Sequence, residues 1–189
     1  MTHAEILNLD VARDDIAASS AGGAPFLICF GVTLFATAIA SFFITREPAA
    51  IIVMFQGNAA LPAAFWLERK MAMRPMTPGN PLASLSVHLA MSQIVAFPIV
   101  IATYSYATSA VPLAMASIAG AHFVPYAWLH RTRAYIVLGI VVAGGAMALQ
   151  ILLGGRAFSW VLILMSVSYW AAAPIVYRHA ARVVRARIR

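Results

Sequence analysis

Charged side chains are scarce in this chain of 189 residues: only 10% are Asp, Glu, Lys or Arg, whereas 62% are apolar or aromatic. A soluble domain has about 25% charged and about 45–50% apolar residues, so this chain cannot cover a globular surface with polar groups. The composition excludes a soluble enzyme, a secreted disulfide scaffold and a nucleic-acid-binding domain. The single cysteine, Cys29, lies in an apolar run, and we expect it to act as a small buried hydrophobic residue.

A secretory signal is also missing from the start of the chain. The first 24 residues contain four acidic residues and one basic residue, Arg13. A signal peptide would need a basic start followed by an apolar stretch within this length. We therefore expect the first membrane-spanning helix to direct the chain to the membrane.

Apolar runs of about 20 residues, long enough for a helix to cross about 30 Å of hydrocarbon, dominate the remainder. Six candidate spans occur, at residues 25–44, 48–67, 82–103, 108–129, 134–153 and 157–177. They lack the alternation of barrel strands and are about twice as long. We predict an all-α integral membrane protein, a six-transmembrane helix bundle over residues 25–177, preceded by a cytosolic segment, 1–24, and followed by an Arg-rich cytosolic tail, 178–189.

The basic residues predict the orientation of this bundle. With six spans and both termini cytoplasmic, 11 of the 13 basic residues face inward, and only Arg46 and Arg156 face outward. Lys and Arg in short loops favour the cytoplasmic side. A single helix across residues 104–107 would reduce the count to five spans, and the basic tail would then lie opposite the other basic loops. The predicted location is the inner membrane of a bacterium.

The N-terminal segment is predicted to form a short cytosolic helix. Thr2 and Glu5 match a capping box. Further along, Ile6, Leu9, Arg13 and Ile16 would share one face. The acidic character of the segment disfavours insertion into an anionic leaflet, so we expect it to bind a partner or the chain's own basic loops.

The C-terminal tail carries a basic stripe on a predicted helix. Its residues are four, three and four positions apart: Arg178, Arg182, Arg185 and Arg189. The stripe could capture anionic lipid headgroups, at about 1 kcal/mol per basic residue. It could also be an anchor that fixes orientation without a specific ligand, which is the simpler interpretation.

Neutral polar residues mark a candidate site inside the predicted spans, which contain no Asp, Glu, Lys or Arg. The candidate pocket, open to the cytoplasm, comprises Gln56, Asn58, His88, Gln93, His122 and Tyr126. His88 and His122 lie at matching depth, about 10 Å from the inner ends of consecutive spans, so we expect them to meet. They would serve as a proton relay or ligand-binding groups. Alternatively, these residues only join helices, at about 0.6 kcal/mol per hydrogen bond.

Other residues limit the chemistry of this candidate pocket. Two histidines without a third ligand at matching depth do not complete a zinc site, so no metal or other cofactor is predicted. No carboxylate within the spans can form a Ser-His-Asp arrangement. His130, at the inner end of the fourth span, is predicted to be an interface residue.

Prolines and small residues predict how the helices bend and pack. Four prolines lie within spans, and each frees the carbonyl four residues earlier: Pro62, Pro98, Pro125 and Pro174. Two pairs of small residues predict close helix packing, Gly139 with Ala143 and Gly144 with Ala148.

Several short segments together resemble an uncharacterised bacterial family of small multi-pass membrane proteins. These segments are Gly23–Leu27, Asn80–Leu82, Gln93 with Pro98, Gly120–Leu129 and Ala134–Tyr135. The resemblance covers about residues 22–177, and Gly120–Leu129 is its most specific part. It implies a membrane location and a multi-pass architecture, but no reaction, substrate or cofactor.

Two classes of function follow from these observations. The first is a non-enzymatic membrane protein, either a transporter of a small solute or a partner within a membrane complex, with a homodimer as one arrangement. The second is a membrane-embedded enzyme acting on lipid or quinone, with His88 and His122 in acid-base roles. The missing carboxylate favours the first class.

Overall fold

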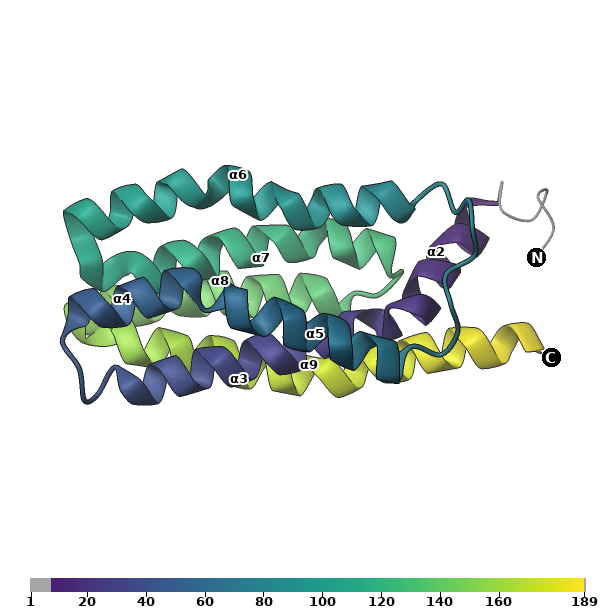
Figure 1. The fold of residues 1–189 in the computed structure, drawn as a ribbon. Helices are drawn as coiled ribbons and strands as arrows, with labels where there is room; N and C mark the ends of the chain where they lie inside the picture. The colour runs from purple at the N-terminus through teal and green to yellow at the C-terminus, as the bar shows by residue number, and fades with distance from the viewer. Residues whose placement is uncertain (1–7, 189) are drawn as a thin grey trace.

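The computed structural model describes residues 8–188, with side chains through residue 186, and this part of the chain is helical without any strand. Figure 1 shows an elongated bundle of helices. The helices are α2 (Leu9–Ser19), α3 (Ala24–Ala40), α4 (Arg46–Phe55), α5 (Gly57–Met71), α6 (Ala83–Ala107), α7 (Val111–Leu129), α8 (Ala134–Leu153) and α9 (Ala157–Ile188), with short 3-10 turns η1 (Ala21–Gly23), η2 (Thr108–Ala110) and η3 (Gly154–Arg156).

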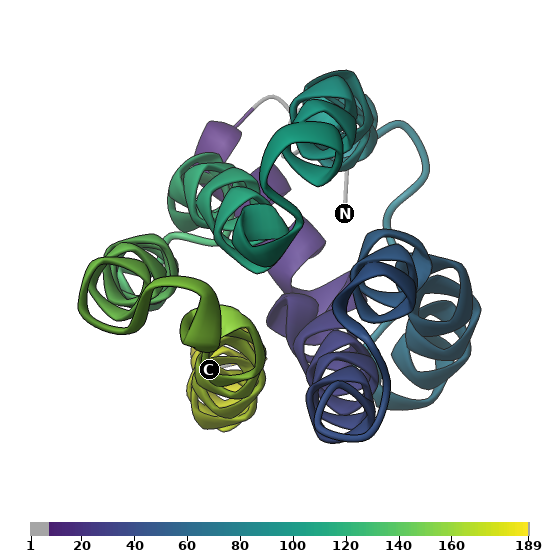
Figure 2. The same cartoon turned by 90° about the vertical axis from the view of Figure 1, so that its left-hand side faces the viewer.

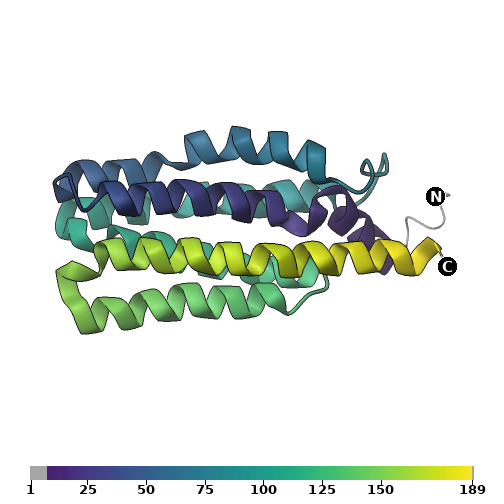
Figure 3. The same cartoon turned by 90° about the horizontal axis from the view of Figure 1, so that it is seen from below.

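The long helices run back and forth along the bundle axis. Helix α3 leads away from the end that α2 covers, which we call the α2 end, and α4 and α5 together return to it (Figure 1). Helices α6, α7, α8 and α9 then alternate in direction, with η2 and η3 at the opposite end. The most extensive pairings are α7 with α8 and α3 with α9, and Figure 3 shows the latter pair side by side.

Four stretches of the described chain are long and apolar enough to cross a membrane: Ala21–Ala40, Arg46–Met71, Ala83–Leu129 and Ala134–Ala186. The last two contain η2 and η3, where the chain reverses direction in Figure 1. The protein is therefore all-helical with long apolar helices, as predicted, and this composition is compatible with a membrane protein.

The stretch predicted as one helix over 48–67 is interrupted between α4 and α5, at Gln56 and Gly57. Glycine weakens a helix by about 1 kcal/mol relative to alanine. One turn later, Pro62 provides no N–H for the carbonyl of Asn58. The side chain of Gln56 is buried at the interruption and accepts a hydrogen bond from the Thr33 hydroxyl of α3, so the break is joined to the neighbouring helix.

Glycines allow α7 and α8 to pack closely. A Cβ on Gly139 would lie 2.6 Å from the Gly120 carbonyl oxygen, and a Cβ on Gly120 would lie 2.8 Å from that of Gly139 and from the Cβ of Ala143. The predicted pair Gly139 and Ala143 therefore packs as expected. The predicted role of Gly144 is wrong within the described residues, because the residue is exposed and a Cβ there would meet open space.

Helix α2 lies across one end of the bundle and is held there by a buried carboxylate. Asp15 is fully buried and accepts hydrogen bonds from the Thr77 amide and hydroxyl, each at 3.0 Å, and from the Asn80 side chain at 2.9 Å. Arg74 pairs with the same carboxylate at 3.0 Å. These contacts fix the loop between α5 and α6 against α2.

A second set of contacts joins α2 to the loop after α7. Arg131 pairs with Asp14 at 3.2 Å and with Asp10 at 3.5 Å. On the same helix, Arg13 donates a hydrogen bond to the Trp128 carbonyl and lies over its ring. The acidic helix thus binds the chain's own basic loops, one of the two predicted alternatives. Its predicted capping residues, Thr2 and Glu5, and Ile6 of the predicted face lie outside the described residues.

Candidate functional site between α6 and α7

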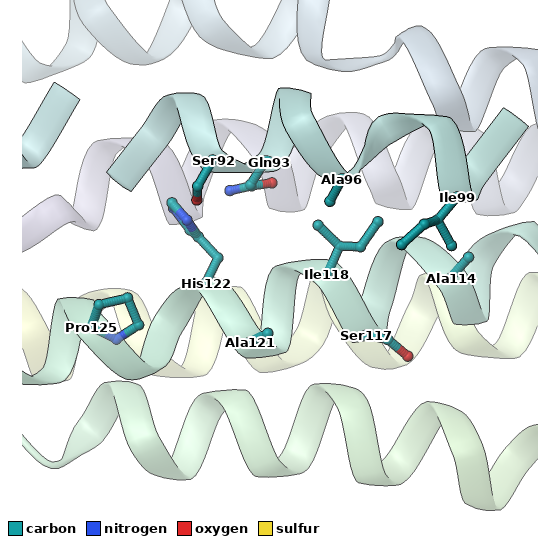
Figure 4. Close-up of a pocket in the computed structure, with 10 residues that line it drawn as sticks. All are labelled: Ser92, Gln93, Ala96, Ile99, Ala114, Ser117, Ile118, Ala121, His122 and Pro125. Carbon is teal, nitrogen blue, oxygen red and sulfur yellow. The ribbon is translucent and has the colours of Figure 1, made fainter. Parts of the chain in front are cut away.

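A groove with a volume of about 510 Å³ lies between α6 and α7. Figure 4 shows the groove with the side chains of the two helices facing each other. The side chains lining it are mainly small or apolar: Ser92, Gln93, Ala96, Ile99, Ala114, Ser117, Ile118, Ala121, His122 and Pro125. Small residues leave space here, because alanine and serine do not fill the gap between two helix backbones.

Two side chains in the groove have unused hydrogen-bonding capacity. The Nδ1 atom of His122 is buried and has no hydrogen-bond partner among the described residues, while the ring interacts with the backbone of Leu89. Gln93 is half-buried in the same groove, and in Figure 4 its carboxamide lies beside Ser92 on α6, with the His122 ring below them on α7. A neutral imidazole can donate at one nitrogen and accept at the other, and a carboxamide can do both.

The α7 backbone adds an acceptor to this pair. Pro125 has no N–H for the Ala121 carbonyl, and both residues line the groove. The Ser92 and Ser117 hydroxyls already donate hydrogen bonds within their own helices. Their acceptors are the carbonyls of Leu89 and Leu113. The polar groups available to a ligand are therefore an imidazole nitrogen, a carboxamide and a backbone carbonyl.

Aromatic rings continue from His122 toward the α2 end. The Tyr126 ring lies 4.7 Å from that of His122 and 5.7 Å from that of His130, measured between centroids. The Tyr126 hydroxyl donates to the Ser86 carbonyl of α6 at 3.2 Å. Tyr135 of α8, centred 5.5 Å from the His130 ring, donates to the Gly22 carbonyl at 2.6 Å. These contacts fix the α2-proximal half of α7 against α6, α8 and η1.

The predicted pocket residues are divided among different environments. Gln93 and His122 line the groove, and Tyr126 packs against His122. His88 is exposed on α6 and is not among the residues lining the groove. Asn58 is exposed on α5, and Gln56 is bonded to α3. Gln93, His122 and Tyr126 are therefore the predicted residues that the structure brings together.

Most of the small groove residues were not predicted from the sequence. The sequence feature that could have indicated them is the spacing of Ala114, Ser117 and Ala121. This spacing places three small side chains along one face of α7. Such a face is usually a packing surface, so spacing alone does not predict a groove.

His130, predicted to be an interface residue at the inner end of the fourth span, directly follows α7. Its side chain is only 3% exposed and lies near Gly23 of η1, among Tyr126 and Tyr135. Burial and the neighbouring His179 lower the pKa of His130 to about 4. We therefore describe His130 as a neutral packing residue at neutral pH.

The basic stripe lies on the last part of α9. Helix α9 runs without interruption from Ala157 to Ile188, and in Figure 1 it extends past the α2 end. Arg178, Arg182 and Arg185 are exposed on it, whereas Arg189 lies outside the described residues. A continuous helix at this spacing places the three guanidinium groups along one side.

The fold and the groove define a class of protein: an all-helical bundle whose long helices are apolar enough for a membrane, with a neutral groove between two of them. Within this class the chain belongs to a family of unknown function, DUF7010, whose model matches residues 9–179. The resemblance to an uncharacterised family is thereby confirmed. None of the curated proteins and none of the solved structures matches this chain.

Proposed function

We propose that this protein crosses a bacterial inner membrane six times, with both termini cytoplasmic, and binds a small molecule in the groove between α6 and α7 without catalysing a reaction. Transport of that molecule and its presentation to a partner protein are the two uses this binding would serve. In this proposal α3, the α4–α5 pair, α6, α7, α8 and α9 each cross the bilayer once.

The observation that carries the binding role is the groove itself. Its volume of about 510 Å³ falls within the range of about 300–1,000 Å³ typical of ligand pockets. It is mainly apolar, with a few polar groups that can orient a ligand. None of the residues lining it is Asp, Glu, Lys or Arg, which favours binding over acid-base chemistry. The enzymatic alternative would need His88 beside His122, but His88 is exposed outside the groove.

The distribution of basic residues supports the orientation. Loops and helix ends at the α2 end carry Arg69, Lys70, Arg74, Arg131, Arg133 and the arginines of α9. At the opposite end, the basic residues of the described chain are Arg46, which begins α4, and Arg156, which ends η3. A basic end of this kind is typically cytoplasmic.

Labelling of single cysteines tests the topology. In a Cys29→Ala background, Arg185→Cys marks the α2 end and Arg156→Cys marks the opposite end; both native side chains are exposed. A maleimide that cannot cross membranes should label position 156 in intact cells and position 185 only after lysis. Labelling of both positions in intact cells, or of position 185 alone, would contradict the proposal.

A further inference from the structure

The groove lies where α6 is weakly packed, and several residues that line it are exposed, among them Ile99, Ser117 and Ala121. Of the 25 residues of α6, only Val100 is buried. Figure 2 shows α6 at the edge of the bundle beside α7, and its contact with α4 includes the Phe55 and Phe97 rings, 6.0 Å apart. In the proposed membrane setting, a ligand would therefore enter sideways from the hydrocarbon.

The depth of the groove restricts the charge of its ligand. His122 lies seven residues before the end of α7, which corresponds to about 10 Å along the helix axis. A charged ligand at this depth would need an opposite charge, because an unpaired ion in hydrocarbon costs several kcal/mol. The lining residues provide no charge of either sign when His122 is neutral.

The polar groups restrict the chemistry further. Gln93 can donate to a ligand carbonyl, and it can accept from a ligand hydroxyl, as can the Ala121 carbonyl that Pro125 leaves free. The unpartnered Nδ1 of His122 adds one more position for a hydrogen bond. On the other side, Ala96, Ile99 and Ile118 offer only hydrocarbon contacts.

We propose that the groove binds an uncharged molecule with a hydrocarbon tail and a head bearing a carbonyl or hydroxyl group. The head would bond to Gln93 and His122, and the tail would extend along the apolar part of the groove into the bilayer. This inference rests on the proposed function and adds the ligand class. A quinone and a monoacylglycerol share this chemistry, and the experiment distinguishes them.

Photolabelling of the full chain in lipid nanodiscs tests the ligand class. The probes are a quinone and a monoacylglycerol, each with a diazirine in its tail, and the labelled peptides are identified by mass spectrometry. Label should appear on α6 and α7 beside the groove, and excess unlabelled quinone or monoacylglycerol should compete with it. Decanoate, which is charged at pH 7.5, should compete at least about tenfold less.

Two leucine substitutions on the same helix provide a matched comparison. Ala96→Leu fills the groove, whereas Ala102→Leu makes the same change at an exposed position that does not line it. The first should reduce labelling by about tenfold or more, and the second should leave it unchanged. Gln93→Leu should also reduce labelling, because it removes the hydrogen bonds while keeping a side chain of similar size.

The outcomes separate this inference from the proposed topology. Labelling by one probe alone assigns the ligand to that source, and labelling by both supports the shared chemistry. No label at the groove, equal labelling of the two leucine variants, or equal competition by decanoate would overturn the ligand class. A contradictory cysteine-labelling result would instead remove the membrane setting of the groove.

Discussion

At the scale of single residues, Asp15 joins α2 to the loop between α5 and α6 through several polar contacts. Its carboxylate accepts three hydrogen bonds and pairs with Arg74, although the residue is fully buried. A buried carboxylate is stable only when such partners replace its hydration. Asp10, five residues earlier in α2, has an exposed side chain and pairs with Arg13 and Arg131.

Asp15→Asn should therefore destabilise the protein much more than Asp10→Asn. The amide group of the new asparagine would face the donors of Thr77 and Asn80, and Arg74 would lose its charged partner. We expect a loss of about 2–3 kcal/mol for Asp15→Asn and less than about 1 kcal/mol for Asp10→Asn. Thermal unfolding in detergent measures both, and equal effects would show that the Asp15 contacts do not hold α2 in place.

His130 should make stability depend on pH. Its pKa is lowered to about 4 in the folded protein, mainly by burial, whereas an unfolded histidine has a pKa of about 6.5. Between these values the unfolded state binds more protons, so stability falls as the pH decreases through this window and is unaffected by His130 above it. The expected loss from pH 6.5 to 5 is about 2 kcal/mol.

The comparison of wild type with His130→Phe isolates this effect. The variant keeps a ring among Tyr126 and Tyr135 but cannot titrate, so its unfolding temperature should depend less on pH between 6.5 and 5. If the variant kept the full acid sensitivity of the wild type, the effect would belong to another group.

At the scale of helices, the pairing of α7 with α8 depends on two glycines that face each other. Gly139→Ala would place a Cβ 2.6 Å from the Gly120 carbonyl oxygen, so one backbone must move. We expect a loss of about 1–3 kcal/mol. Gly144→Ala on the same helix meets open space and should be neutral or stabilising by up to about 1 kcal/mol. Thermal unfolding of the two variants in one detergent checks this contrast, and similar losses would contradict it.

The end of α9 leads to a prediction about lipids. Arg182 is exposed within the basic stripe, and Arg156 is exposed at the opposite end. If the stripe binds anionic headgroups, Arg182→Gln should weaken retention of phosphatidylglycerol by about fivefold, equivalent to about 1 kcal/mol, while Arg156→Gln should not. Native mass spectrometry of protein with bound lipid measures retention. Equal retention of the lipid by both variants would instead support the interpretation that the stripe fixes orientation without a specific ligand.

At the scale of the whole molecule, the all-helical class could be predicted from composition. Which side of each helix faces its neighbours could not. Counting residues gave His88 and His122 similar depth, and depth depends only on the rise of 1.5 Å per residue. Whether a side chain faces a neighbour depends also on rotation, at about 100° per residue. Packing of Leu89 and Gln93 toward α7 turns His88 to the outside, and this rotation is fixed by contacts absent from the local sequence.

The contacts of α2 were more predictable than those of the groove. Three aspartates in a chain with only six acidic residues had few partners other than the many basic loop residues. Charge therefore indicated the docking of α2 onto these loops as one of two alternatives, the other being a separate partner. The interruption at Gln56 and Gly57 was less visible, because apolar composition continues through it and neither residue ends a helix in every context.

The position of α2 has a consequence for the order of assembly during synthesis. Thr77 follows Asp15 by 62 residues, and Arg131 follows Asp14 by 117 residues. At about 5–20 residues per second, the ribosome needs about 6–23 s to make the second interval. Helix α2 therefore meets Arg131 only after α7 is complete, and it packs against α9 only after the last described helix has been made. In the proposed topology, this end of the bundle can therefore close completely only after all six crossings have been made.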